Sequence, residues 1–251
     1  MVGVGEAEPP RTNDSGRGTL LGGRMLSFSS AYEERFPATS LITGVARKGL
    51  FVQARPIPRY LRTPREAQLD ETRKGLVQKE VCEMLSLGVI EKVPGGGPSH
   101  PFTAYSRMIV VPKPHSDKLR PCLDLSEVNK FIPNEGFKME GIKTAKELLR
   151  PGDSLCKVDI KSAYWQVPIA RECRDLFRFV HQGTHYRHVG MPMGLNSAPR
   201  LFTRIVKAIL APLRLQGIRI VIYLDDILVI GESQREATEN VQALVTQLLR
   251  L

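Results

Sequence analysis

Apolar residues recur at helical spacing in three stretches of the chain. A helix is predicted to begin after Asp70 or Thr72 and to end at Gly88, with apolar side chains three or four positions apart between them. A second helix is predicted after Ser197, which is placed as its N-cap, and a third after Gly231. A shorter helix is predicted over residues 144–149.

Short apolar, β-rich runs alternate with turn residues and predict several hairpins. Gln182 and Gly183 are predicted to form the turn of one hairpin, and Asp225 and Asp226 the tip of another. The predicted strands are residues 108–111, 119–125, 155–160, 177–180, 186–189, 218–222 and 227–230. This mixture of helices and antiparallel strands indicates an α/β protein of the α+β type.

Residues 1–65 lack a regular apolar pattern. Glycine and proline are frequent near the start, and residues 50–64 carry Pro56, Pro58 and Pro64, which favour extended backbone. The pattern predicts a partly disordered leader or linker over 1–65 and a folded domain over 66–251.

The chain is strongly basic. Its 251 residues carry a formal net charge of +10, with a pI of about 9.6. This surplus favours a polyanionic partner, most simply nucleic acid, although a membrane surface or a merely basic protein would also fit. No run of apolar residues is long enough for a membrane span or a signal peptide, so no membrane partner is expected.

The four cysteines indicate the compartment. Cys82, Cys122, Cys156 and Cys173 show no C-x-x-C spacing and are expected to be reduced thiols. An intracellular protein is therefore predicted, in the cytoplasm or the nucleus.

Two acidic strand ends carry the candidate chemistry. Asp225 and Asp226 lie between apolar runs, and Asp159 ends another apolar run. Carboxylates near a low-dielectric core need a counter-charge, and Mg²⁺ prefers such hard oxygen ligands. The pattern suggests a two-metal site, in which ions about 3.5–4 Å apart share carboxylates. The alternative is a polar hairpin turn with Asp159 as a helix N-cap.

Four segments in order resemble the motifs of reverse transcriptases. Residues 157–164 (KVDIKSAY), 190–199 (GMPMGLNSAP) and 223–226 (YLDD) resemble the three catalytic motifs. Upstream, 111–113 (VPK) and 119–125 (LRPCLDL), followed by Asn129 and Lys130, resemble the fingers segment. Taken together, these segments are most similar to the reverse transcriptases of retrotransposons of the DIRS or gypsy kind.

The resemblance implies a polymerase fold and assigns metal ligands. An antiparallel palm sheet backed by helices is expected over about 151–251, with fingers over about 66–150 and part of 165–195. Asp159 and Asp225 would bind two Mg²⁺ ions, with Mn²⁺ as a substitute, and Asp226 would support them. The Ile160 carbonyl would also contact a metal.

The resemblance also assigns nucleotide contacts. Tyr164 would exclude a ribose 2′-hydroxyl, unless it is only a core aromatic, and Lys113 and Arg120 would hold the triphosphate, unless they form a solvated hairpin face. Met193 would lie against the nucleotide. Weaker contacts with template or phosphate are expected from Asn196 and Arg200, near the start of the predicted helix.

The implied reaction is RNA-directed DNA synthesis. A primer 3′-hydroxyl on an RNA or DNA template attacks a deoxynucleoside triphosphate. Tyr164 disfavours an RNA-templated RNA polymerase. Because the chain stops soon after the YLDD segment, a thumb is expected to be missing, which would weaken activity. The alternative is a catalytically dead or domesticated fragment that acts only as a basic nucleic-acid-binding module.

Overall fold

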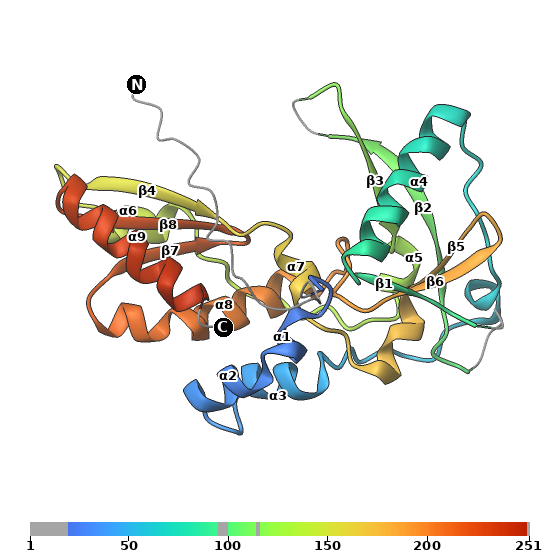
Figure 1. The fold of residues 1–251 in the computed structure, drawn as a ribbon, viewed down its shortest axis with the longest axis horizontal. Coiled ribbons are helices and arrows are strands. Elements are labelled where there is room, and N and C mark those ends of the chain that lie inside the picture. The colour runs from blue at the N-terminus through green and yellow to red at the C-terminus, as the bar shows by residue number, and fades with distance from the viewer. Residues whose placement is uncertain (1–19, 95–99, 114–115, 250–251) are drawn as a thin grey trace, which may run out of the picture.

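Two separate β-sheets, one in each half of an elongated molecule, organise the fold (Figure 1). The computed structural model describes residues 20–94, 100–113 and 116–249. One sheet has five strands and the other has three. Helices pack against both, and the buried apolar side chains form one core cluster that extends through both halves.

The five-stranded sheet combines strands from distant parts of the chain. Its order is β1 (Ile90–Lys92), β6 (Thr184–His188), β5 (Arg178–His181), β2 (Tyr105–Pro112), β3 (Leu119–Asp124). The β5–β6 and β2–β3 hairpins form as the sequence predicted, with Gln182 and Gly183 in the first turn. However, β2 pairs in parallel with β5, a contact that no local pattern predicts.

Helix α4 (Glu71–Ser86) packs against this sheet and confirms the predicted helix. The Asp70 side chain accepts a hydrogen bond of 2.8 Å from the Arg73 amide, which is the geometry of an N-cap. Gly88 follows the helix with a φ of 67°, a conformation that favours glycine. The short helix α5 (Ser126–Asn129) follows β3.

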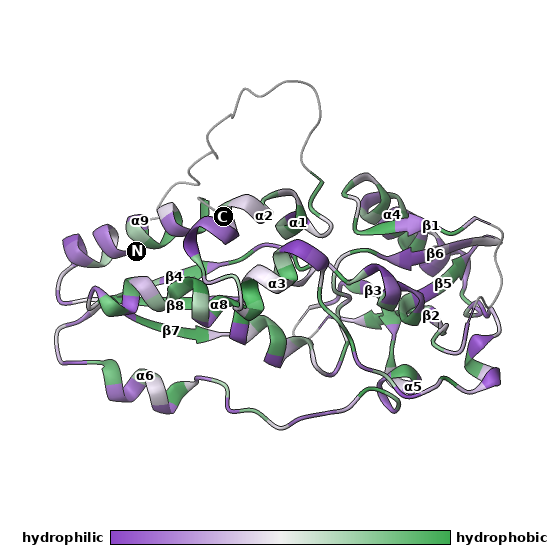
Figure 2. Ribbon diagram, turned by 90° about the horizontal axis from the view of Figure 1, so that it is seen from below, coloured by the Kyte–Doolittle hydropathy of each residue, from purple (hydrophilic) through white to green (hydrophobic). Residues whose placement is uncertain are grey.

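The three-stranded sheet is fully antiparallel, in the order β4 (Ser154–Asp159), β8 (Asp226–Gly231), β7 (Arg219–Tyr223). Alternate residues point to one face, where Ile220, Ile222, Ile227 and Val229 are buried. Helices α8 (Ala198–Leu215) and α9 (Gln234–Leu249) contact this sheet, and α6 (Ile142–Leu148) lies along its β7 side (Figure 2). The predicted α/β fold, with an antiparallel palm-like sheet backed by helices, is confirmed.

One detail of the α8 prediction is wrong. Ser197 occupies the N-cap position, but its side chain makes no capping hydrogen bond. Pro199 lies in the first turn instead, where its missing amide hydrogen costs nothing.

The N-terminal segment corrects the prediction of a leader or linker over 1–65. From Leu20 onward it forms α1 (Arg24–Ser27), α2 (Ser29–Arg35), α3 (Leu41–Lys48) and the 3₁₀ turn η1 (Arg59–Arg62). Its apolar side chains join the core, among them Met25, Ile42 and Leu61. These helices have at most eight residues, too few to show a periodic stripe. The disorder predicted near residues 3–18 lies outside the described residues.

The N-terminal segment also joins the two halves. The Gly22 amide donates to the Leu87 carbonyl, at the end of α4, and the Gly23 amide donates to the Trp165 carbonyl; both distances are 2.8 Å. Trp165 belongs to α7 (Ala163–Gln166), which lies between the sheets and precedes the 3₁₀ turn η2 (Arg171–Phe177). In the described part of the chain, no helix is both long and apolar enough to span a bilayer.

His188 places an ionisable group inside the five-stranded sheet. It pairs with Ile90 across β1 and β6, and only 3% of its surface is exposed. Neither ring nitrogen has a hydrogen-bond partner among the described residues. Burial therefore lowers the pKa of His188 to about 4, opposed only by the nearby Gly190 backbone.

His188→Phe is expected to remove part of the protein's acid sensitivity. His188 takes up a proton near pH 6.5 in the unfolded chain but only near pH 4 in the folded chain. The contribution of neutral His188 to the free energy of unfolding is therefore complete above pH 6.5 and is lost as the pH falls toward 4. At about pH 5 the loss amounts to about 2 kcal/mol. Urea unfolding at about pH 7.5 and about pH 5 measures it, with His100→Gln, at an exposed site, as control. Equal pH dependence in His188→Phe and the parent would contradict the prediction.

Candidate active site

The three aspartates predicted to be catalytic come together at one end of the three-stranded sheet. Asp159, the last residue of β4, pairs across the sheet with Asp226, the first residue of β8. Directly opposed residues of antiparallel strands carry their side chains on the same face. Asp225 lies in the adjoining turn, and its carbonyl oxygen accepts a hydrogen bond of 3.0 Å from the Ile160 amide. The backbone of both acidic segments is therefore in direct contact.

The turn that carries Asp225 is tight. Tyr223 pairs with Asp226, so Leu224 and Asp225 form the loop between β7 and β8, and the prediction that Asp225 and Asp226 form the tip is wrong by one residue. Leu224 has a φ of 56°, a conformation that costs a non-glycine residue on the order of 1 kcal/mol. The paired, buried strands on either side hold it there, and strain of this kind clusters at functional sites.

The argument that the aspartates sit near a low-dielectric core is corrected by the structure. Ile222 and Ile227 are fully buried. However, Asp159 and Asp225 are exposed, and the Asp226 side chain is 41% exposed. The strand interiors are buried while the carboxylates reach water. A metal ion is therefore not needed to offset desolvation of these carboxylates. The argument for a metal site depends instead on the oxygen ligands that come together here.

Lys157 is a site residue that the sequence interpretation did not single out. Its Nζ lies 2.9 Å from Asp226 Oδ1. The hydrogen bond to Asp226 raises the pKa of Lys157, and the charges of Asp226, Asp159 and Asp225 raise it further. One ammonium thus faces three carboxylates. The signal was available in the sequence, because Lys157 lies two residues before Asp159 and so shares its face of β4.

The carboxylates fit magnesium without forming a closed cage. Among the described residues, no group of three or more His, Cys, Asp or Glu side chains is positioned to hold a metal ion. Mg²⁺ is usually bound by one or two carboxylates together with water and substrate phosphates, so such a cage is not required. Asp159 and Asp225 form no ion pair with another described residue, which leaves their oxygens available.

Tyr164 lies between the aspartates and the core. Its ring meets Phe202 of α8 edge-on, with centroids 5.2 Å apart and planes at 87°. Burial raises the pKa of its hydroxyl, and the negative charge of Asp225 adds to the rise. The half-buried ring therefore packs against the core and also lies close to Asp225, so the two interpretations of Tyr164 are compatible.

Lys113 and Arg120 lie in the other half of the molecule, on the β2–β3 hairpin (Figure 1). Both are exposed, and Arg120 is paired with Val111. Burial and the negative charge of Glu83 raise the pKa of Glu80 on α4, and the positive charge of Arg120 opposes that rise. In the described structure, neither cation forms an ion pair or hydrogen bond with the aspartates.

The remaining predicted contacts belong to the segment before α8 and to the first turn of α8. Met193 is 42% exposed. The Asn196 side-chain amide donates to the carbonyls of Asn129 and Ile132, at 3.3 and 3.2 Å, so both of its hydrogens are used inside the protein. Arg200 forms an ion pair of 2.6 Å with Glu135. Asn196 thus fastens the segment to α5, and its amide has no donor left for a phosphate.

Gly190→Ala is expected to destabilise the fold by about 1–3 kcal/mol, because a Cβ at this position would overlap the Trp165 carbonyl oxygen. Urea unfolding measures the effect. Gly44→Ala is the matched control, since no heavy atom lies within 4 Å of its added Cβ in α3. Gly44→Ala should leave the free energy of unfolding unchanged or raise it by up to about 1 kcal/mol. A Gly190→Ala protein as stable as the parent would rule out the close approach.

Comparison with known families identifies this arrangement. The family model described as "Reverse transcriptase (RNA-dependent DNA polymerase)" matches residues 111–251, which include both acidic segments. The chain belongs to the reverse transcriptase family. The family is that of RNA-directed DNA polymerases, which are nucleotidyltransferases.

Curated proteins similar to this chain include Pol polyproteins of a transposon and of a retrovirus. It is 25% identical over 183 residues to the Pol polyprotein from transposon 297 of Drosophila melanogaster, covering 72% of this chain and 16% of the relative. It is 27% identical over 190 residues to the Gag-Pol polyprotein of Woolly monkey sarcoma virus, covering 72% and 11%. The chain thus spans a small part of the relatives it matches.

Solved structures agree on the fold. The foamy viral protease-reverse transcriptase in complex with dsDNA has a TM-score of 0.64 at 24% identity, covering 78% of this chain and 38% of that chain. The same protein in complex with an RNA/DNA hybrid has a TM-score of 0.62 at 24% identity, covering 79% and 25%. At this identity the likeness concerns the fold alone.

Proposed function

We propose that this chain is the polymerase domain of a retrotransposon Pol protein of the DIRS or gypsy kind. It adds deoxynucleotides to a primer 3′-hydroxyl on an RNA template and also accepts DNA. The observation that carries the proposal is the pairing of Asp159 with Asp226, beside a strained turn that presents Asp225. A basic protein with such a site suits a polyanionic substrate.

Asp159 and Asp225 are the residues that would hold two Mg²⁺ ions, with Mn²⁺ as a substitute and the Ile160 carbonyl as a further ligand. Bound metal supplies charge stabilisation and lowers the pKa of the attacking hydroxyl. The bond formed joins the primer O3′ to the α-phosphorus, the bond broken releases pyrophosphate, and the hydroxyl proton passes to solvent. Both aspartates are exposed, so a triphosphate has access to them.

Asp226 has a supporting role in this proposal. Its carboxylate is engaged by Lys157 at 2.9 Å, whereas Asp159 and Asp225 have no such partner among the described residues. The ammonium offsets part of the negative charge that the three carboxylates gather before substrate arrives. This division explains why adjacent aspartates in one segment would take different roles.

Substrate contacts follow from the same arrangement. Tyr164 presents its ring near Asp225, where it would exclude a ribose 2′-hydroxyl by clash. Met193 is exposed and would lie against the nucleotide. Lys113 and Arg120 would reach the triphosphate from the fingers half, as positive charges facing the developing phosphate charge. Primer–template is the proposed partner, as in the foamy viral complexes with dsDNA and RNA/DNA hybrid.

Single-nucleotide extension tests this function. The protein, a labelled DNA primer on an RNA template and the matched deoxynucleotide should give extension with Mg²⁺ and none with EDTA. Because the phosphate contacts are electrostatic, primer–template binding itself should weaken steeply with salt. Binding with no extension and no effect of nucleotide would favour the alternative, a basic nucleic-acid-binding module.

A further inference from the structure

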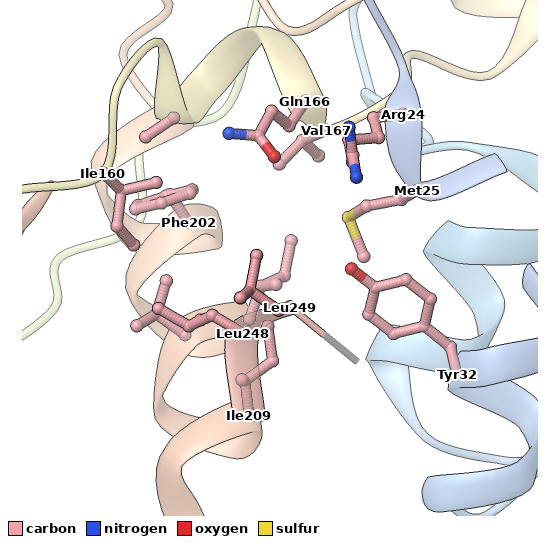
Figure 3. A pocket seen from close by; sticks show the side chains of 13 residues that line it. Arg24, Met25, Tyr32, Ile160, Gln166, Val167, Phe202, Ile209, Leu248 and Leu249 are labelled. Carbon is pink, nitrogen blue, oxygen red and sulfur yellow. The ribbon is translucent and has the colours of Figure 1, made fainter. Parts of the chain in front are cut away.

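A pocket of about 320 Å³ lies between the N-terminal helices and the palm half (Figure 3). Side chains from α1, α2, α7, α8 and α9 line it. Met25 and Tyr32 stand on one side, while Phe202, Ile209 and Leu248 stand on the other (Figure 3). The pocket is separate from the carboxylates, although Ile160 lines it and directly follows Asp159.

The palm side of the pocket is apolar. Phe202, Ile205, Val206 and Ile209 line it from α8, and each is at most 6% exposed. Its volume corresponds to about ten waters, at the lower end of the range for small-molecule sites. Such a wall favours a hydrocarbon or aromatic group over water.

Polar groups without partners stand on the opposite side. Tyr32 is only 6% exposed, and its hydroxyl has no hydrogen-bond partner among the described residues. The Arg24 guanidinium has no hydrogen bond or ion pair within the described structure either; it lies 4.7 Å from the centroid of the Phe28 ring. Burial raises the pKa of Tyr32 to about 12, with the nearby Arg24 charge acting in the opposite direction. Tyr32 is therefore a hydrogen-bond donor at neutral pH.

We propose that this pocket binds a small amphipathic anion. The anionic head, such as a carboxylate, lies between Arg24 and the Tyr32 hydroxyl, and the apolar body lies along Phe202 and Ile209 of α8. A cation and a buried hydroxyl donor, neither of them hydrogen-bonded or ion-paired to a described residue through its side chain, match an anionic acceptor. The apolar wall excludes a simple inorganic anion as the whole ligand. The proposal does not depend on the polymerase function.

Decanoate is the probe, and decanol, with the same chain and no charge, is its matched control. Binding is measured by calorimetry and by the fluorescence of Trp165, the single tryptophan, whose neighbour Gln166 lines the pocket. We expect saturable binding of decanoate, about tenfold tighter than that of decanol. Equal affinities for the two probes, or no saturable binding, would overturn the proposal.

Variants locate the site. Arg24→Gln should weaken decanoate about tenfold and leave decanol unchanged, and Tyr32→Phe, which keeps the ring, should weaken decanoate about fivefold. Arg47→Gln removes an exposed arginine of α3 that does not line the pocket and should have no effect. If Arg24→Gln and Tyr32→Phe bind decanoate as tightly as the parent, the anion binds elsewhere. The same conclusion follows if Arg47→Gln weakens decanoate as much as Arg24→Gln does.

Discussion

Asp225→Asn is expected to abolish the Mg²⁺-dependent affinity for a matched deoxynucleotide and to lower primer extension at least about a hundredfold. Asn keeps the size of the side chain but removes the charge that attracts a divalent cation. Because Asp225 is exposed and its backbone carbonyl makes the contact to Ile160, the fold should remain intact. Nucleotide titration with primer–template, with and without Mg²⁺, measures the loss.

Duplex binding separates the enzyme from a simple binding module. Asp225→Asn should bind primer–template as well as the parent or slightly more tightly, because one negative charge near the backbone is gone. Asp117→Asn makes the same charge change at an exposed position in the β2–β3 hairpin and should leave extension unchanged. If neither the parent nor Asp225→Asn responds to Mg²⁺ and nucleotide, the polymerase proposal is wrong.

Tyr164→Ala is expected to raise the use of ribonucleotides relative to deoxyribonucleotides by about a hundredfold. The ring is fixed edge-on against Phe202 and close to Asp225, so it occupies space beside the reacting nucleotide. Ala removes that obstacle to a 2′-hydroxyl. Steady-state incorporation of both substrates gives the ratio of their kcat/KM values.

Tyr164→Phe is the matched control for this experiment. It keeps the ring and its contact with Phe202 and removes only the hydroxyl, so the selectivity should stay close to that of the parent. Because Ala also removes packing, urea unfolding of both variants is needed to show that the folded fraction is unchanged. An unchanged ratio in a folded Tyr164→Ala protein would leave Tyr164 with a packing role alone.

The sequence by itself determined the elements whose signals are local. Helix α4 begins after its N-cap Asp70 and ends before Gly88, because an N-cap and a glycine stop act within one turn of the helix. The β7–β8 hairpin follows from two apolar runs around a two-residue turn. The resemblance to reverse transcriptases came from four segments in order, of which this acidic hairpin and the segment around Asp159 are two, because such motifs are short and contiguous.

Only the tertiary structure decided what depends on distant residues. The helices between Arg24 and Lys48 are too short to show periodicity and are held by burial against α7 and α8. The parallel pairing of β2 with β5, and the exposure of carboxylates at the ends of buried strands, also escape local patterns. Lys157 shares a face with Asp159, which the sequence shows, but its ion pair with Asp226 required the register of β4 and β8. In each case the deciding energy comes from contacts between segments that are far apart in sequence, and a single sequence carries no direct record of those contacts.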